Sequence, residues 1–168
     1  MPYGHLNLAM REAVRPFVAG KTVYDLGAGD CDHARTLVGL GASSVVAIDK
    51  VPPVGRVATG VQFIQGYIAD VPIPDNVPVV FLGWPQNYAI PGLLEWLHRA
   101  ETVVYLGSNL NGSACAFPDV FRHFMTRKLA VYIEDRRNNL LVLRETLPEP
   151  RLPVLEERGC FSDEILIL

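Results

Sequence analysis

Cysteine is scarce in this chain, and a long apolar run is absent. The 168-residue sequence holds three cysteines that are far apart and match neither a zinc-binding spacing nor a disulfide framework: Cys31, Cys115 and Cys160. No stretch of about 18 consecutive apolar residues is present, so no segment is predicted to span a membrane. The N-terminus also lacks the charged start and apolar stretch of a secretory leader. We therefore expect no metal, no membrane contact and a cytoplasmic location.

Positive charge is not in excess either. The formal net charge is −3 and the isoelectric point is near 5.8. A protein that coats nucleic acid is normally basic, so this charge argues against such a role and leaves open a nucleic acid that is bound transiently as a substrate. Hydrophobic residues make up 49% and charged residues 20%, which is typical of a globular chain and not of a disordered one.

The length is that of one domain. The composition changes near residue 148, where Pro148, Pro150 and Pro153 precede several acidic residues and an apolar end at 165–168. Prolines at this density favour a stiff, extended linker. We predict one domain over residues 1–147 and a proline-rich, acidic tail over 148–168, which either packs on the domain or contacts a partner.

Strand-like and helix-like segments alternate along the domain. The predicted strands are 22–26, 44–48, 61–68, 77–82, 102–106, 129–133 and 140–144. The predicted helices are 6–17, 33–40, one that opens at Pro91 and one that opens at Pro118. Proline and glycine in 51–60 predict a loop where a further helix would be expected. This alternation predicts a three-layer, Rossmann-like α/β fold whose sheet is mostly parallel and ends in an antiparallel hairpin.

A glycine-rich turn, Gly27-Ala28-Gly29-Asp30, follows the first predicted strand and leads into a helix that Asp30 or Asp32 is expected to cap. The second strand is followed by an acid, Asp49. A glycine turn after one strand and an acid after the next mark a nucleotide-type ligand site in an α/β sheet. The turn lacks the G-x-x-x-x-G-K-[ST] pattern of a phosphate-binding P-loop.

The charge of the turn bears on which ligand it binds. The dinucleotide fingerprint G-x-G-x-x-G needs a glycine where this chain has Asp32. The carboxylates of Asp25, Asp30 and Asp32 would also repel a pyrophosphate. S-adenosylmethionine has no phosphate and carries a sulfonium and an ammonium group, so an acid-rich turn suits it. A nicotinamide-dependent oxidoreductase remains the alternative from another enzyme class.

Two motifs carry a family resemblance. Asp25-Leu26-Gly27-Ala28-Gly29-Asp30 resembles the first motif of class I S-adenosylmethionine-dependent methyltransferases, and Val45-Val46-Ala47-Ile48-Asp49 resembles their second. Cys31 stands where many members have a third glycine. The resemblance covers roughly residues 20–146. It implies a seven-strand sheet whose last strand is antiparallel, S-adenosylmethionine as cofactor and methyl transfer as the activity.

The resemblance also implies which residues contact the cofactor. They are Asp25, Gly27, Ala28, Gly29 and Asp30 in the turn, Asp49 and Lys50 after the second strand, and Tyr67, Ile68 and Gly83 after the third and fourth. Members of the family place a Gly-Asp pair after strand three, whose acid meets the adenine amino group. The aligned pair here is Gly66-Tyr67, with Asp70 as the nearest acid, so either Tyr67 or Asp70 is the candidate adenine contact.

The segment after the fourth strand is the candidate catalytic loop, because ligands in such sheets bind outside the carboxyl ends of the strands. It consists of Trp84, Pro85, Gln86, Asn87 and Tyr88. Methyltransferases that act on amino groups have a D/N-P-P-Y/F/W loop here, and this chain lacks the leading acid or amide. Its Gly-x-Pro-Gln string is more similar to small lysine methyltransferases of the ATP-synthase c-subunit type.

The resemblance therefore implies a protein amine or another amine as the methyl acceptor. A nucleic-acid methyltransferase and a catalytically silent cofactor-binding fold remain alternatives. His123 lies in a locally basic region that includes Arg127, and both are predicted to belong to a solvated face. Neither the oligomeric state nor a general base follows from the sequence.

Overall fold

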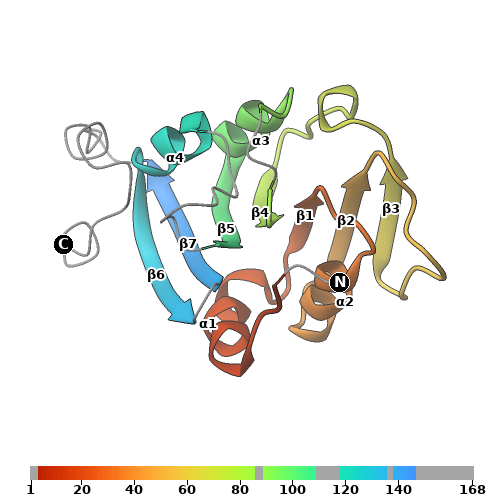
Figure 1. Ribbon diagram of the computed structural model, residues 1–168, viewed down its shortest axis with the longest axis horizontal. Helices are drawn as coiled ribbons and strands as arrows, with labels where there is room; N and C mark the ends of the chain where they lie inside the picture. Colours follow the sequence, from red (N-terminus) through yellow and green to blue (C-terminus); the bar gives the residue numbers. More distant parts are fainter. Residues whose placement is uncertain (1–3, 86–88, 109–117, 136–137, 147–168) are drawn as a thin grey trace.

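The computed structural model describes residues 4–85, 89–108, 118–135 and 138–146, which form one sheet with helices packed against it (Figure 1). The elements in chain order are α1 (Leu8–Val18), β1 (Thr22–Leu26), α2 (Asp32–Gly39), β2 (Ser44–Asp49), β3 (Val61–Gln65), η1 (Ile68–Asp70), β4 (Val77–Gly83), α3 (Leu93–Arg99), β5 (Ala100–Ser108), α4 (Pro118–Phe124), β6 (Arg127–Asp135) and β7 (Asn138–Thr146). Residues 51–60 contain no helix, as predicted. Within the described ranges, no helix has the length and apolar character needed to cross a lipid bilayer. The predicted tail, 148–168, lies outside the described residues.

The seven strands lie in the order β3-β2-β1-β4-β5-β7-β6. Neighbours among β1 to β5 pair in parallel, whereas β7 pairs antiparallel with both β5 and β6. This confirms the predicted α/β fold with a mostly parallel sheet and an antiparallel C-terminal hairpin. The strand order reverses between β1 and β4, so a crevice opens at the carboxyl ends of these two strands. Ligands bind at this point in sheets of this kind.

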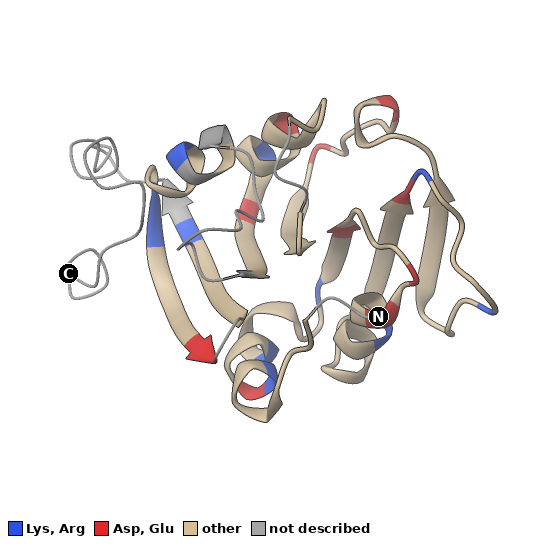
Figure 2. Cartoon of the chain, in the orientation of Figure 1, with Lys and Arg blue, Asp and Glu red and all other residues tan. Residues whose placement is uncertain are grey.

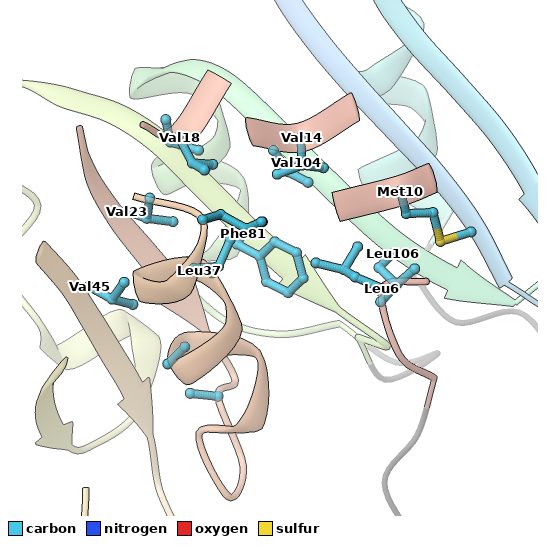
Figure 3. Close-up of a cluster of buried hydrophobic side chains, with 14 of the residues drawn as sticks. Leu6, Met10, Val14, Val18, Val23, Leu37, Val45, Phe81, Val104 and Leu106 are labelled. Carbon is cyan, nitrogen blue, oxygen red and sulfur yellow. The ribbon is translucent and has the colours of Figure 1, made fainter. Parts of the chain in front are cut away.

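Two apolar cores hold the helices against the two faces of the sheet. Helices α1 and α2 cover one face, and α3 and α4 cover the other (Figure 1). Strand β4 contributes to both, because successive side chains point to opposite faces: Val79 and Phe81 to the first core, Val80 and Leu82 to the second. Figure 3 shows Phe81 in the middle of the first core, close to Leu37 of α2.

The predicted end of the third strand is wrong. The sequence predicts a strand over 61–68, but β3 ends at Gln65. The N–H of Gly66 donates to the carbonyl of Asp49 at 3.0 Å, and the chain then turns into the short helix η1. The apolar pattern continues to Ile68 because the side chain of Ile68 is buried in the second core, so the pattern extends beyond the end of the strand.

The predicted start of α3 is also wrong. Pro91 precedes the helix instead of occupying its first turn, and the helix begins at Leu93. Gly92 between them has a φ of +80°, which no helical residue adopts. A Cβ on Gly92 would lie 2.6 Å from Cα of Ala69, so the close contact with η1 requires glycine here.

The solvated face predicted around His123 is wrong as well. The side chains of His123 and Arg127 are buried, at 7% and 4% exposure. Nε of Arg127 donates a hydrogen bond to Nε2 of His123 at 3.0 Å. Burial, followed by the positive charge of Arg127, lowers the pKa of His123 to about 4, so the ring is neutral and can accept this bond. The hairpin of β6 and β7 brings Arg127 under α3 and α4, a long-range arrangement that charge patterning does not predict.

Candidate functional site

The turn between β1 and α2 presents an open backbone to the crevice. Gly27 and Gly29 have φ values of +79° and +52°, in the left-handed region that residues with a Cβ avoid. A Cβ built on either glycine would meet no atom within 4 Å. The space above the turn is therefore free for a ligand that approaches the main chain closely.

Cys31 also adopts a left-handed conformation, with φ +61°, at the N-cap of α2. The third glycine of the family motif suits this position because glycine adopts such a φ without strain. The expectation that Asp30 or Asp32 caps the helix is wrong, since α2 has no side-chain cap. Asp32 pairs with Arg35 at 2.9 Å, and Oδ1 of Asp30 accepts a hydrogen bond from the N–H of Val54 at 3.3 Å.

Asp49 ends β2 and joins two loops. Its Oδ2 accepts a hydrogen bond from the N–H of Gly29 at 2.8 Å, and its Oδ1 accepts one from the N–H of Val51 at 2.9 Å. Each carboxylate oxygen keeps another lone pair, so this half-buried group can still accept hydrogen bonds from a ligand. Asp49 thus fixes the glycine turn relative to loop 51–60 and faces the crevice between them.

Asp25 differs from the other acids of the turn because it is buried, at 1% exposure. Among the described residues, the backbone N–H of Ala34 donates to the carboxylate, and Oδ2 has no hydrogen-bond partner. Burial, and then the negative charge of Asp49, raise the pKa of Asp25 to about 7 in spite of that hydrogen bond. Asp25 therefore lies beneath the turn as an acid that titrates near neutral pH.

We expect Asp25 to make folding stability depend on pH. Its folded pKa is raised from 3.8 to about 7, so its contribution to stability is complete below the unfolded value and is lost as the pH rises through the folded value. The unfolding free energy of Asp25→Asn relative to wild type should increase by about 2 kcal/mol between about pH 5 and about pH 7.5. Urea denaturation at both pH values measures this, and an unchanged difference would contradict it. His123 titrates in both proteins and cancels in the comparison.

An apolar cavity of about 320 Å³ lies at the carboxyl ends of β1, β2 and β4. Its walls include Leu26, Ile48 and Ile68, and the side chains of Lys50 and Tyr67 lie at its edge. Tyr67 is 65% exposed. Asp70, the other candidate adenine contact, is not among the residues that line the cavity. Of the two candidates, the structure therefore brings Tyr67 to the cavity.

A second cavity of about 550 Å³ adjoins the first and is more polar. It lies over the glycine turn and is lined by the acids Asp30, Asp32 and Asp49 and by the imidazoles of His5 and His33. The two cavities share four lining residues, which are Gly27, Asp49, Gly83 and Trp84. Figure 2 shows acidic residues at the ends of β1 and β2 and in the turn before α2. The combined site is apolar at one end and acidic at the other.

The structure brings most of the predicted site residues to these cavities. Every predicted cofactor-binding residue except Asp25 lines one or both: Gly27, Ala28, Gly29, Asp30, Asp49, Lys50, Tyr67, Ile68 and Gly83. Of the predicted catalytic loop, Trp84 and Pro85 line the site. The predictions for Gln86, Asn87 and Tyr88 lie outside the described residues.

The N-terminal segment forms one wall of the second cavity. A Cβ on Gly4 would lie 2.8 Å from Cε2 of Trp84, so the main chain of Gly4 rests directly on the indole. Nδ2 of Asn7 donates to Oδ2 of Asp135 at 2.9 Å, which ties the segment to the end of β6. The contact between Asn7 and Asp135 joins residues that are 128 positions apart in the sequence, and no local pattern predicts either contact.

Sequence reasoning missed His33, which lies in the first turn of α2. The residue is half-buried and lines the second cavity. Its ring centroid is 5.2 Å from that of Phe81, on β4. One signal could have found it: His33 precedes the buried Leu37 by four residues, so both lie on the core-facing stripe of the helix. A polar ring on such a stripe next to a ligand-binding turn is a candidate site residue.

Known structures share the fold of this chain. No protein-family model and no curated protein matches the chain. The ribosomal protein L11 methylase of Lactobacillus delbrueckii superposes with a TM-score of 0.58 at 16% identity, covering 86% of this chain and 81% of that one. A SAM-dependent methyltransferase of Aquifex aeolicus gives 0.57 at 15% identity and 79% and 88% coverage. A candidate RNA methyltransferase of Pyrococcus horikoshii gives 0.56 at 14% identity and 82% coverage of both chains. The chain is similar to class I methyltransferases in fold.

Proposed function

We propose that this chain is an S-adenosylmethionine-dependent methyltransferase that acts on an amine of a protein. One observation carries the proposal: an apolar and an acid-lined cavity meet above a glycine turn whose main chain is open. S-adenosylmethionine has a neutral adenine ring at one end and cationic groups at the other. The polarity of the site changes in the same sense along its length.

The residues of the turn fit this cofactor. Any side chain on Gly27 or Gly29 would occupy the space where the cofactor is expected, and none is present. The apolar walls of the first cavity, Leu26, Ile48 and Ile68, would hold the adenine ring. Asp49 has free lone pairs at the junction of the two cavities and would accept hydrogen bonds from the ribose hydroxyls.

The chemistry places limited demands on the protein. S-adenosylmethionine supplies a methyl group on a cationic sulfur, which is already a strong electrophile. The chain's own task is to hold the acceptor in line with that group and to exclude water. Half-buried Trp84 lies at the junction of the cavities, and buried Pro85 follows it on the wall of the first cavity, where the two residues would position an acceptor.

The charge of the second cavity supports an amine over a nucleic acid. Asp30, Asp32 and Asp49 line it, and no lysine or arginine in the described part of the chain does. A phosphate backbone would be repelled by these carboxylates, whereas an ammonium group would be attracted before it loses its proton. The indole of Trp84 adds an aromatic surface on which a cationic amine is stabilised.

Calorimetry and isotope labelling test the proposed function. S-adenosylhomocysteine should bind and NAD should not, because the acidic turn repels a pyrophosphate. Label from methyl-tritiated S-adenosylmethionine should enter the protein fraction of a cell extract and should be released by protease and not by nuclease. Binding of NAD alone would contradict the proposal. Label that only nuclease releases would leave methyl transfer standing and overturn the amine acceptor.

A further inference from the structure

We propose that His33 is a catalytic residue that contacts the methyl acceptor and takes its proton. This inference rests on the proposed function and deepens it, because it assigns a proton acceptor to the same site. The residue is the second of α2 and is half-buried on the wall of the acidic cavity. A half-buried imidazole placed there can meet a ligand from one side while the protein holds it from the other.

The position of the ring is fixed by β4. Its centroid lies 5.2 Å from that of Phe81, which is fully buried in the first core, with the planes tilted by 44°. A Cβ built on Gly83 would lie 2.9 Å from Cδ2 and 3.3 Å from Nε2 of His33. The edge that carries Nε2 therefore lies against the last residue of β4, directly before the candidate acceptor loop begins at Trp84.

Gly83 is part of this arrangement. A Cβ at position 83 would lie too close to the imidazole and would displace it. The same Cβ would lie 3.0 Å from Cε1 of Phe81. The ring of Phe81 thus supports the imidazole of His33, and Gly83, which has no side chain, leaves space beside it. Together they hold His33 beside Gly83, on the wall of the cavity that the glycine turn and Trp84 also line.

Carboxylates from several elements line the same cavity as His33, and one of them, that of Asp32, is paired with Arg35 at 2.9 Å. Asp30 lies in the turn, Asp32 starts α2 and Asp49 ends β2. Asp25, on β1, is buried beneath the turn and does not line the cavity. Besides His33, the only other imidazole on this cavity's described wall is that of His5. A proton transferred to His33 would therefore arrive in a cavity that carboxylates line.

The lone pair of the acceptor nitrogen forms the new N–C bond with the methyl group, and the electron pair of the broken S–C bond stays on the sulfur. The proton on the acceptor nitrogen passes to Nε2 of His33, and the resulting imidazolium later releases it to water. No oxidant or further reactant is needed.

Two substitutions test this role, His33→Gln and His33→Asn, with His98→Gln as the matched control. His98 is an exposed histidine on α3 and lines neither cavity. Loss of a proton acceptor should lower kcat for tritium transfer into the protein fraction about 100-fold and remove the acidic limb of the pH profile. Calorimetric binding of S-adenosylhomocysteine should change less than about threefold, which also shows that the variants are folded.

A second measurement does not depend on turnover. In ¹⁵N-histidine spectra of the protein saturated with S-adenosylhomocysteine, n-butylamine should shift the ring nitrogens of His33 saturably and leave those of His98 unchanged. Variants with wild-type kcat and pH profile, or ring-nitrogen signals of His33 that do not shift, would overturn the inference and leave the proposed methyltransferase function standing.

A parallel loss of S-adenosylhomocysteine affinity with the pH profile retained would overturn it too, because His33 would then hold the cofactor. A wild-type protein that transfers no label would instead refute the proposed function, and the amine titration would still decide whether His33 contacts an amine.

Discussion

Gly27→Leu is expected to weaken the binding of S-adenosylhomocysteine by about 100-fold or more, which is about 2.7 kcal/mol of binding free energy. Gly27 lines both cavities, and a Cβ placed on it points into space that holds no protein atom. A leucine side chain would fill this space at the place where the cofactor must approach the main chain. The same substitution removes no packing contact from the folded protein.

A matched control separates this blockage from backbone strain. Gly20, before β1, has a φ of +72° against +79° for Gly27, and a Cβ there would also meet no atom within 4 Å. It lines neither cavity. Gly20→Leu should therefore lose as much stability as Gly27→Leu, on the order of 1–2 kcal/mol, and bind with wild-type affinity.

Isothermal titration and thermal unfolding of both variants provide the readout. The proposal predicts similar melting temperatures and very different affinities. If Gly27→Leu bound S-adenosylhomocysteine as tightly as Gly20→Leu, the turn would not be the cofactor site. Equal loss of binding in both variants would show that strain, and not blockage, is responsible.

Arg127→Met is expected to destabilise the protein by about 3–5 kcal/mol, the largest effect on stability that we predict. The guanidinium donates to four backbone carbonyls at 2.5–3.5 Å, those of Leu97, Ala100, Glu101 and Arg144. Its Nε also donates to His123. These partners belong to α3, β5, β7 and α4, so one side chain joins four elements to β6.

The destabilisation arises from the buried backbone carbonyls that lose their hydrogen-bond donor. Replacing a buried charge and its partner together by apolar residues is often tolerated, but here the partners are main-chain carbonyls that no substitution can remove. Methionine would leave these buried acceptors unsatisfied. The carbonyls of Leu97 and Ala100 also lie at the C-terminal end of α3, where a cation is favoured by the helix dipole.

Urea denaturation measures this effect, and two further variants serve as controls. Lys128→Met alters the exposed neighbouring residue and should change stability by less than about 0.5 kcal/mol. Arg127→Lys should recover only a small part of the loss, because one ammonium group cannot reach carbonyls on three elements. A loss below about 1 kcal/mol in Arg127→Met would contradict the assigned role of the guanidinium.

The local features of the site were predictable because they depend on short segments. The glycine turn at Gly27 and Gly29 and the acid at Asp49 have fixed spacing relative to strands that their apolar runs reveal. In a parallel sheet the carboxyl ends of strands share one edge, so residues after β1, β2 and β4 had to meet. The structure brings them together around the two cavities.

The exceptions involve residues whose surroundings come from distant parts of the chain. Asp25 belongs to the motif, yet its side chain is buried, and burial followed by the negative charge of Asp49 raises its pKa, so it lies beneath the cavities instead of lining them. Arg127 resembles the nearby exposed Arg122 in the sequence, but the β6–β7 hairpin places it under α3 and α4. Burial of a charged group depends on which element covers it, and that is not encoded locally.

The sequence alone thus determined the α/β class, the parallel sheet with its antiparallel hairpin and the position of the glycine turn, because these follow from periodicity and from glycine's freedom at positive φ. Only the tertiary structure decided that Asp25 is a buried acid, that Gly4 lies on Trp84, and that His33 faces the same cavity as the glycine turn. The physical reason is that side-chain environment is set by packing between elements far apart in the chain, whereas the backbone pattern is set by neighbours.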